Sequence, residues 1–184
     1  TFIIPLEEIV PNLRRYAGQR KINISDIPEY AILNDDWSDA DKYMSFTDEP
    51  TIPDKWSNRV DSRLGHISLV RRVDLTAVGT HHLAYYSEDM RLYPDMMWVL
   101  PSASQEQSKV LAAWFDSTFG WLQSIFTRVE TRGGWIEWHG YIVDKYQVPV
   151  FSSIDNDVHR DRIIDTFDII KDADAPSLVR QLAL

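Results

Sequence analysis

The fold is decided by one helix-forming stretch, SQEQSKVLAAWFDSTFGWLQSIFTRV, which runs from Ser104 to Val129. Ser104 and Gln107 match a capping box, in which each side chain accepts a hydrogen bond from the backbone N–H of the other residue. Apolar side chains then repeat at the spacing of one helix face: Val110, Leu111, Trp114, Phe115, Leu122, Ile125, Phe126 and Val129. Gly120 lies within that face, where glycine costs about 1 kcal/mol relative to alanine. We therefore expect one long helix kinked near Ser117 to Gly120, or two helices in succession.

Upstream of this stretch, the sequence changes to strand-like patterns. In HISLVRRVDL (66–75), Ile67 and Leu69 alternate with Ser68 and Val70, which is the two-residue period of a strand. HHLAYYS (81–87) and MMWVL (96–100) follow after charged, turn-like segments. We expect an antiparallel meander of strands packed against the helix. After the helix, GGWIEW (133–138) predicts a further strand entered through a glycine turn, with one of its two tryptophans exposed.

The two ends of the chain predict peripheral elements. The opening segment favours a helix from about Leu6 to Tyr16, because Glu7 and Glu8 fall in its first turn, as the helix dipole prefers. A strand over 29–34 and an acidic surface loop over 35–53 follow. A short helix is expected over 141–146, an amphipathic helix over 158–170, and another near Pro176. The fold class is α+β, in segments 1–54, 55–151 and 152–184 of one compact unit.

Composition excludes several classes of protein. The 184 residues are 44% hydrophobic, enough for a core, and hold no cysteine, so neither a disulfide framework nor a thiolate metal site is possible. No apolar stretch is long enough to span a bilayer and no leader pattern opens the chain, so a cytoplasmic location is expected. Because the chain begins at Thr1, it is expected to be part of a longer protein.

Charge is distributed unevenly along the chain. The net charge of -9 argues against indiscriminate nucleic-acid binding, which needs clustered basic side chains. Between Lys55 and Arg72, however, five basic residues face Asp61 alone, whereas 35–49 holds six carboxylates and only Lys42. A basic stripe set between acidic flanks is therefore one interpretation, and a well-mixed solvated surface is the other.

The sequence contains no established catalytic motif. HExxH, GxSxG, P-loop and GxGxxG patterns are missing. His81 and His82 are adjacent, so on a strand they point to opposite faces and cannot share a metal, although either could pair with Asp74 or Glu88. Ordinary structural roles are the simpler interpretation of both histidines.

A resemblance to a known enzyme family is carried by the string WFDSTFGWLQSIFTRVETRGGWIEWHGYIVDKYQVPVF, Trp114 to Phe151. It resembles the C-terminal region of the N6-adenine DNA methylases of restriction–modification systems. In those enzymes a helix carries an LNSxxG-like stretch, here WFDSTFG, with Phe115 and Asp116 where Leu and Asn are usual. An ETRGxW turn follows, here ETRGGW, and then a short helix that closes with a PVP-like end, here VPVF. The likeness begins near Trp56 and includes the upstream strands.

The resemblance implies a non-catalytic domain. The NPPY motif that holds the flipped adenine and the glycine-rich S-adenosylmethionine motif occur nowhere in the chain. No cofactor is therefore expected here, and S-adenosylmethionine belongs to a catalytic domain outside this chain. The implied function is target recognition or specificity, with double-stranded DNA, the catalytic domain, and restriction or specificity subunits as partners, and no membrane.

The DNA-facing residues are expected in the basic stripe and around the ETRGGW turn. Because Arg71 and Arg72 alternate on a strand, at most one faces DNA while the other meets the core or a carboxylate. The alternative, favoured by the acidic total, is an interaction or scaffold module that docks the catalytic domain or a partner subunit. A nuclease using Asp54 and Lys55 is a third option. The expected DNA-binding residues are Lys55, Arg59, Arg63, Arg71, Arg72, Arg128 and Arg132.

Overall fold

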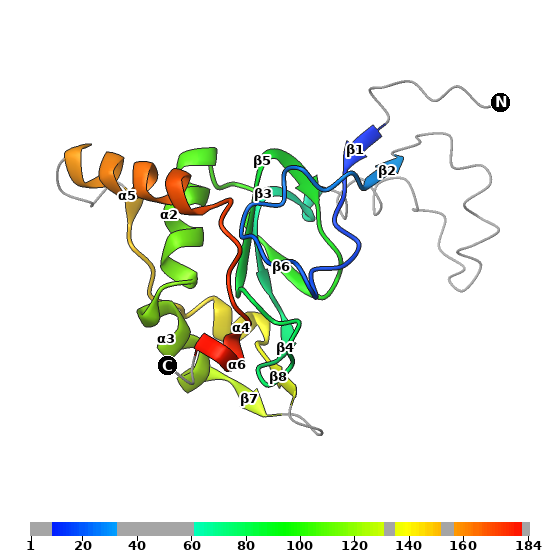
Figure 1. Ribbon diagram of the computed structural model, residues 1–184, viewed down its shortest axis with the longest axis vertical. Helices are drawn as coiled ribbons and strands as arrows, with labels where there is room; N and C mark the ends of the chain where they lie inside the picture. Colours follow the sequence, from blue (N-terminus) through cyan, green and yellow to red (C-terminus); the bar gives the residue numbers. More distant parts are fainter. Residues whose placement is uncertain (1–8, 33–60, 131–134, 152–156, 182–184) are drawn as a thin grey trace.

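A three-stranded antiparallel sheet forms the middle of the fold (Figure 1). The computed structural model describes residues 9–32, 61–130, 135–151 and 157–181. In it, β3 (Leu64–Val70) lies between β5 (Ala84–Leu92) and β6 (Met97–Val99). Ile67 pairs with Tyr86 on one side of β3, and Leu69 pairs with Trp98 on the other. The α+β class is confirmed, with strands where the alternating segments predicted them.

The strand order differs from a simple meander. After β5 the chain crosses to the far side of β3, because the outer edge of β5 is already occupied by the N-terminal segment. There the Ile24 N–H donates to the Tyr86 carbonyl at 2.8 Å, and the Tyr86 N–H donates to the Ile22 carbonyl at 2.9 Å. An edge strand with unpaired backbone groups is thereby avoided.

A second small sheet continues from the first. β4 (Arg72–Asp74) follows β3 directly and pairs with β8 (Trp135–Glu137), which also pairs with β7 (Val129–Glu130). The strand predicted from GGWIEW is confirmed as β8. Trp138 beyond it is 2% exposed and Trp135 is 40% exposed, so one tryptophan is outside and the other inside, as expected.

The decisive stretch forms two helices in succession. α2 (Gln105–Phe115) begins at Ser104, whose capping box with Gln107 is complete, and α3 (Thr118–Thr127) begins at Ser117. The expectation of two helices is confirmed, and that of one long helix is wrong. The last predicted helical residue, Val129, instead opens β7.

The N-terminal helix prediction is wrong over the described residues. Ile9–Pro11 is strand β1, paired with β2 (Tyr30–Ile32), which confirms the strand expected there. Tertiary hydrogen bonds override the local pattern: the Leu13 N–H donates to the Leu92 carbonyl at 2.9 Å, and Arg91 donates to the Asn12 carbonyl at 2.6 Å. The predicted acidic loop over 35–53 lies outside the described residues.

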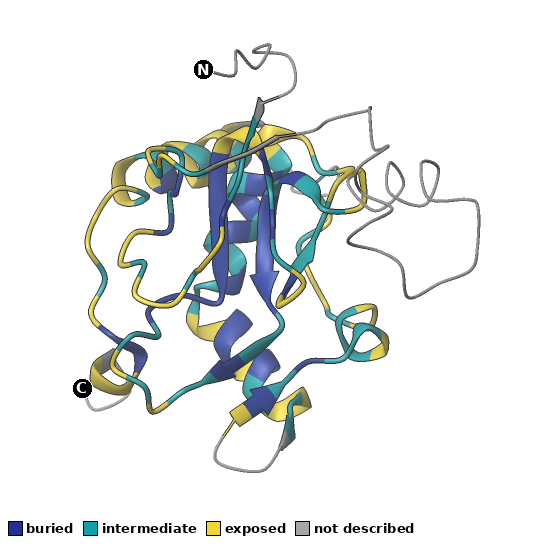
Figure 2. Cartoon of the chain, turned by 90° about the vertical axis from the view of Figure 1, so that its right-hand side faces the viewer, coloured by how far each residue is buried: buried dark blue, intermediate teal, exposed yellow. Residues whose placement is uncertain are grey.

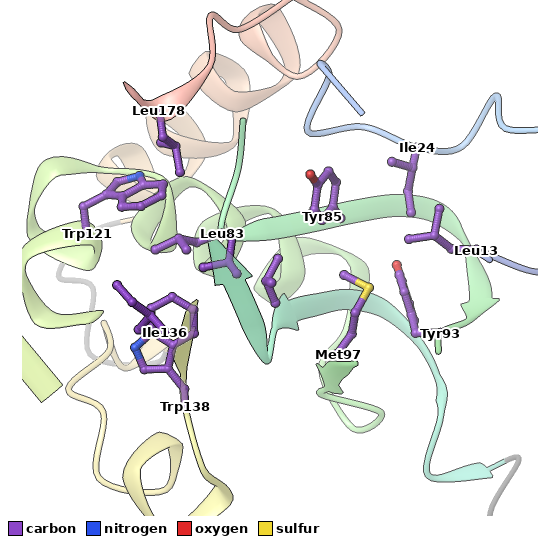
Figure 3. Packing of buried hydrophobic residues seen from close by; sticks show 12 residues of the cluster. Leu13, Ile24, Leu83, Tyr85, Tyr93, Met97, Trp121, Ile136, Trp138 and Leu178 are labelled. Carbon is purple, nitrogen blue, oxygen red and sulfur yellow. The ribbon is translucent and has the colours of Figure 1, made fainter. Parts of the chain in front are cut away.

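The described ranges contain three more helices: α4 (Gly140–Val143), α5 (Asp157–Ile170) and α6 (Leu178–Gln181). α4 begins where a short helix was predicted, and α5 confirms the amphipathic helix and packs on α2 (Figure 1). Buried residues from both ends of the chain meet the sheet in one cluster, which includes Leu13, Trp121 and Leu178 (Figure 3). The central strands are buried and the outer loops exposed (Figure 2). Within the described ranges, no helix has the length and apolar character needed to traverse a bilayer.

Candidate functional site

The predicted DNA-binding residues divide into two groups. Lys55, Arg59 and Arg132 lie outside the described residues, as do Asp54 and the interior of the ETRGGW turn. The other four arginines are described, and each has a defined partner. The structure therefore tests how far a continuous cationic face extends among Arg63, Arg71, Arg72 and Arg128.

Arg63 is bound to the turn between β5 and β6. Its Nη2 lies 2.7 Å from Asp95 Oδ1, while Nη1 donates to the carbonyls of Pro94 at 3.1 Å and Met97 at 3.0 Å. The guanidinium charge is therefore matched by a carboxylate, and its donors bind the backbone of the turn. This geometry gives Arg63 a structural role in fixing where β6 begins.

Arg71 is also paired with a carboxylate. Its Nε and Nη2 each lie 3.2 Å from Glu137 Oε1, and the guanidinium carbon lies 5.2 Å from the Trp98 ring centroid. The expectation that one of the two adjacent arginines meets a carboxylate is thus confirmed for Arg71. Arg71 lies between β3 and β4, and its side-chain contacts reach Glu137 of β8 and Trp98 of β6.

Arg72 has a different kind of partner. Its guanidinium carbon lies 5.2 Å from the ring centroid of Trp135, a cation–π contact. A tryptophan ring stabilises the cation without cancelling its charge, as a carboxylate would. The Tyr16 hydroxyl donates to the Arg72 carbonyl, and burial raises the pKa of Tyr16 while the Arg72 charge opposes that rise.

Arg128 is the C-terminal cap residue of α3. Its Nη1 donates to the Ile125 carbonyl at 2.6 Å, so the cation lies where the helix dipole is negative. The next residue, Val129, pairs with Glu137, and Glu137 pairs with Arg72 on its other side. Arg72, Arg128 and Trp135 therefore gather on or beside the small sheet, and we call these three residues the small-sheet patch.

A largely buried pair that the sequence did not predict lies at the end of α2. It is formed by His82 and by Asp116, the C-cap residue of α2. His82 Nδ1 is 3.0 Å from Asp116 Oδ2, and His82 Nε2 is 2.9 Å from the Arg20 carbonyl. The expectation that a histidine pairs with Asp74 or Glu88 is wrong for His82. Asp116 Oδ1 also accepts the Leu83 N–H at 2.8 Å, which fixes the carboxylate.

The partners of His82 determine its protonation. A backbone carbonyl can only accept, so Nε2 carries a proton, and the carboxylate favours a second proton on Nδ1. Burial lowers the pKa of His82, but the hydrogen bond and charge of Asp116 and the Arg20 carbonyl raise it above its usual range overall. With both ring nitrogens engaged by protein groups, His82 has no free lone pair to act as a general base, so the geometry gives it a structural role.

One feature of the sequence could have indicated this pair: a carboxylate at the C-terminus of a predicted helix. Asp116 caps α2, where the helix dipole disfavours negative charge. Such a residue needs a compensating cation, but the sequence does not say that the cation is His82. The buried His81 next to it has its Nδ1 2.9 Å from the Ala175 carbonyl.

The DSTFG part of the resemblance forms the corner between α2 and α3. Asp116 fixes His82, and the Ser117 hydroxyl donates to the Trp114 carbonyl at 2.6 Å while accepting the Gly120 N–H at 3.4 Å. A Cβ on Gly120 would lie 2.3 Å from the Trp114 carbonyl oxygen and 2.6 Å from Phe115 Cα. Only glycine lets the two helices approach this closely.

One side of α3 is apolar and exposed. Phe119 is 68% exposed, Leu122 44% and Phe126 81%, at the spacing of one helix face. The Phe119 ring also stacks on Trp114, with centroids 6.0 Å apart and planes 8° apart. We call Phe119, Leu122 and Phe126, together with Trp114 near the end of α2, the α3 apolar face, which is the kind of surface that partners cover.

Across the described ranges, no three histidine, aspartate or glutamate side chains are grouped as metal ligands. Comparison with known proteins found no matching family model, no matching curated protein and no matching solved structure.

Proposed function

We propose that this chain is the non-catalytic target-recognition domain of an adenine-N6 DNA methyltransferase of a restriction–modification system. The observation that supports this proposal most directly is the small-sheet patch. There the Arg72 guanidinium packs on the partly exposed Trp135 ring, and Arg128 lies beside the same sheet. In sequence, β7 and β8 are joined by the ETRGGW turn with Arg132, the most specific part of the resemblance.

The proposed DNA surface is narrower than the sequence predicts. Arg63 and Arg71 are bound to Asp95 and Glu137, so contacting a phosphate would require breaking or sharing an ion pair. Arg72 meets an uncharged ring, so its positive charge stays available to phosphate oxygens, and Arg128 adds a second cation beside the same sheet. We assign DNA contact to the small-sheet patch and structural roles to the two paired arginines.

The division of labour follows from the chemistry of the reaction. The catalytic domain, which carries S-adenosylmethionine, must extrude adenine from the base stack at a cost of a few kcal/mol. A second domain binds the duplex, so that adenine is flipped only in certain DNA sequences. Phosphate contacts set the register, and contacts to base edges read the sequence.

Kinetics of the complete methyltransferase test this assignment. Arg72→Gln combined with Arg128→Gln should lower kcat/KM for target DNA. The slope of log affinity against log salt should also become shallower by about 1 for each phosphate group that the variant no longer binds. Lys145→Gln, which removes an exposed charge outside the patch, is the matched control. Unchanged affinity and sequence preference in the double variant would remove DNA binding from the patch.

A docking module is the second candidate function, and the α3 apolar face favours it. The occupant would be the catalytic domain or a restriction or specificity subunit, held by apolar contact. Binding of that kind hardly responds to salt, whereas DNA binding weakens steeply. In this case Phe126→Ser, but not the Arg72 and Arg128 variants, would release the partner in a pull-down from purified components.

A further inference from the structure

The outward face of α5 is apolar and cationic, although the chain as a whole is acidic. Ile163 is 37% exposed, Ile170 52% and Ile169 80%. Arg162 lies between them on the helix surface, and no carboxylate in the described ranges is within ion-pair distance of its guanidinium. At 3.6 residues per turn, Asp161 and Asp168 fall on the other side of α5, whereas Asp165 lies at the edge of this face, beside Ile169.

A groove runs along this face. A cavity of about 370 Å³ is lined by Ala113 of α2 and by His159, Arg162, Ile163 and Ile170 of α5. It shares Ala113, Phe167 and Ile170 with a second cavity of about 270 Å³ that extends to Asp174. The groove thus runs from a cationic end at His159 and Arg162, past the isoleucines, to an end that is lined by Asp174 and, deeper, by Asp116 and the two histidines.

We propose that this groove binds α5 of a second copy of the chain, antiparallel and related by a two-fold axis. A two-fold interface requires a patch that is complementary to itself. In the antiparallel arrangement, the His159–Arg162 end of one copy meets Asp174 of the other, and Ile163 lies against Ile169 and Ile170 of the second copy. A parallel arrangement would instead place Arg162 against Arg162.

The acidic end of the groove keeps an accessible charge. Asp174 pairs with Arg20 at 3.3 Å, but both side chains are more than half exposed, at 53% and 58%. An exposed pair of this kind is weak, so Asp174 can also meet a second guanidinium. The interface does not depend on the proposed DNA binding, because the small-sheet patch lies on other elements.

Cysteine crosslinking tests the geometry directly, because the chain contains no cysteine. Thr166 is exposed, faces the groove, and lies midway in sequence between His159 and Asp174, close to the proposed axis. Under mild oxidation with diamide, Thr166→Cys should give a covalent dimer that a reductant reverses. The exposed Lys145→Cys, away from α5, is the matched control and should stay monomeric on denaturing gels.

Charge exchange tests the pairing. In sedimentation equilibrium, the wild type should be dimeric, Arg162→Glu and Asp174→Lys should each be monomeric, and the two substitutions together should restore the dimer. Lys145→Glu should remain dimeric, and circular dichroism should show that every variant is folded.

Several outcomes overturn the proposal. They are a wild type that is monomeric at every concentration, Thr166→Cys crosslinking no better than its control, or a double variant no more dimeric than the single ones. If a monomeric wild type binds a catalytic domain through Ile170, the groove belongs to that occupant and not to a second copy.

Discussion

The imidazole of His82 is held between the Asp116 carboxylate and a backbone carbonyl, with its Nδ1 3.0 Å from Asp116 Oδ2. The pair joins the segment just before β5 to the C-cap residue of α2. Because the pKa of His82 is raised in the folded protein, the folded state binds this proton more tightly than the unfolded chain, whose histidine has the usual pKa of about 6.5.

The stability of the protein should therefore fall as pH rises. The folded pKa of His82 is raised, so its contribution is complete below the usual value and is lost as pH passes through the raised folded value. Urea unfolding from pH 5 to 9 should show this decline in the wild type. Asp116→Asn keeps an acceptor for the Leu83 N–H but removes the charge, so its decline should be smaller. An equally steep decline in Asp116→Asn would contradict the ion pair.

Gly120→Ala should destabilise the protein, although alanine is the better helix former. The added Cβ would meet the Trp114 carbonyl oxygen at 2.3 Å, so α2 and α3 must separate, at about 1–3 kcal/mol or more. Gly79→Ala is the control, because a Cβ there lies no closer than 3.6 Å to its nearest neighbour. Equal unfolding free energies for the two variants in urea would show that the corner tolerates a side chain.

Replacement of Arg91 should loosen the N-terminal segment. This arginine is 2% exposed and donates to the carbonyls of Asn12 at 2.6 Å, Ser25 at 3.0 Å and Ile27 at 3.1 Å. Arg91→Met leaves those acceptors without their donor, at about 3 kcal/mol or more. Limited proteolysis should then cut within 9–32 first, while Arg180→Met, at an exposed position, should leave the rate unchanged. Uniform acceleration across the chain would argue against a local role.

Ser104→Ala should lower the unfolding free energy by about 1 kcal/mol. The Ser104 hydroxyl accepts the Gln107 N–H at 3.2 Å, and Gln107 Oε1 accepts the Ser104 N–H at 2.9 Å. Ser102→Ala, two residues before the cap and exposed, should have no measurable effect. If both substitutions gave the same unfolding midpoint, the capping box would contribute nothing to stability.

Local patterns predicted the elements that are governed by local physics. The Ser104 cap, the alternation in β3 and the amphipathic α5 were all readable, because each depends on neighbours within a few residues. The N-terminal helix prediction failed, because Leu13 and Asn12 bind β5 residues far along the chain. A pattern within a few neighbouring residues cannot predict that these two residues bind the edge of β5.

The candidate site was less predictable than the fold. A run of arginines in sequence does not reveal whether each has a carboxylate partner, and Glu137 is 66 positions from Arg71. The sequence did indicate that Arg71 and Arg72 must differ, because neighbours on a strand point to opposite faces. Which of them meets the carboxylate depends on the pairing of β4 with β8, which is set by the tertiary structure.

The central position of β3 has a consequence for motion. With β5 on one side and β6 on the other, each backbone amide of β3 points to one of these neighbours, so its exchange requires that the central sheet itself opens. The hydrogen–deuterium exchange of these amides should therefore report the opening of the entire domain, whereas the short ladder between β1 and β2 exchanges through local fraying. The slowest amides of the molecule are expected between Ile67 and Val70.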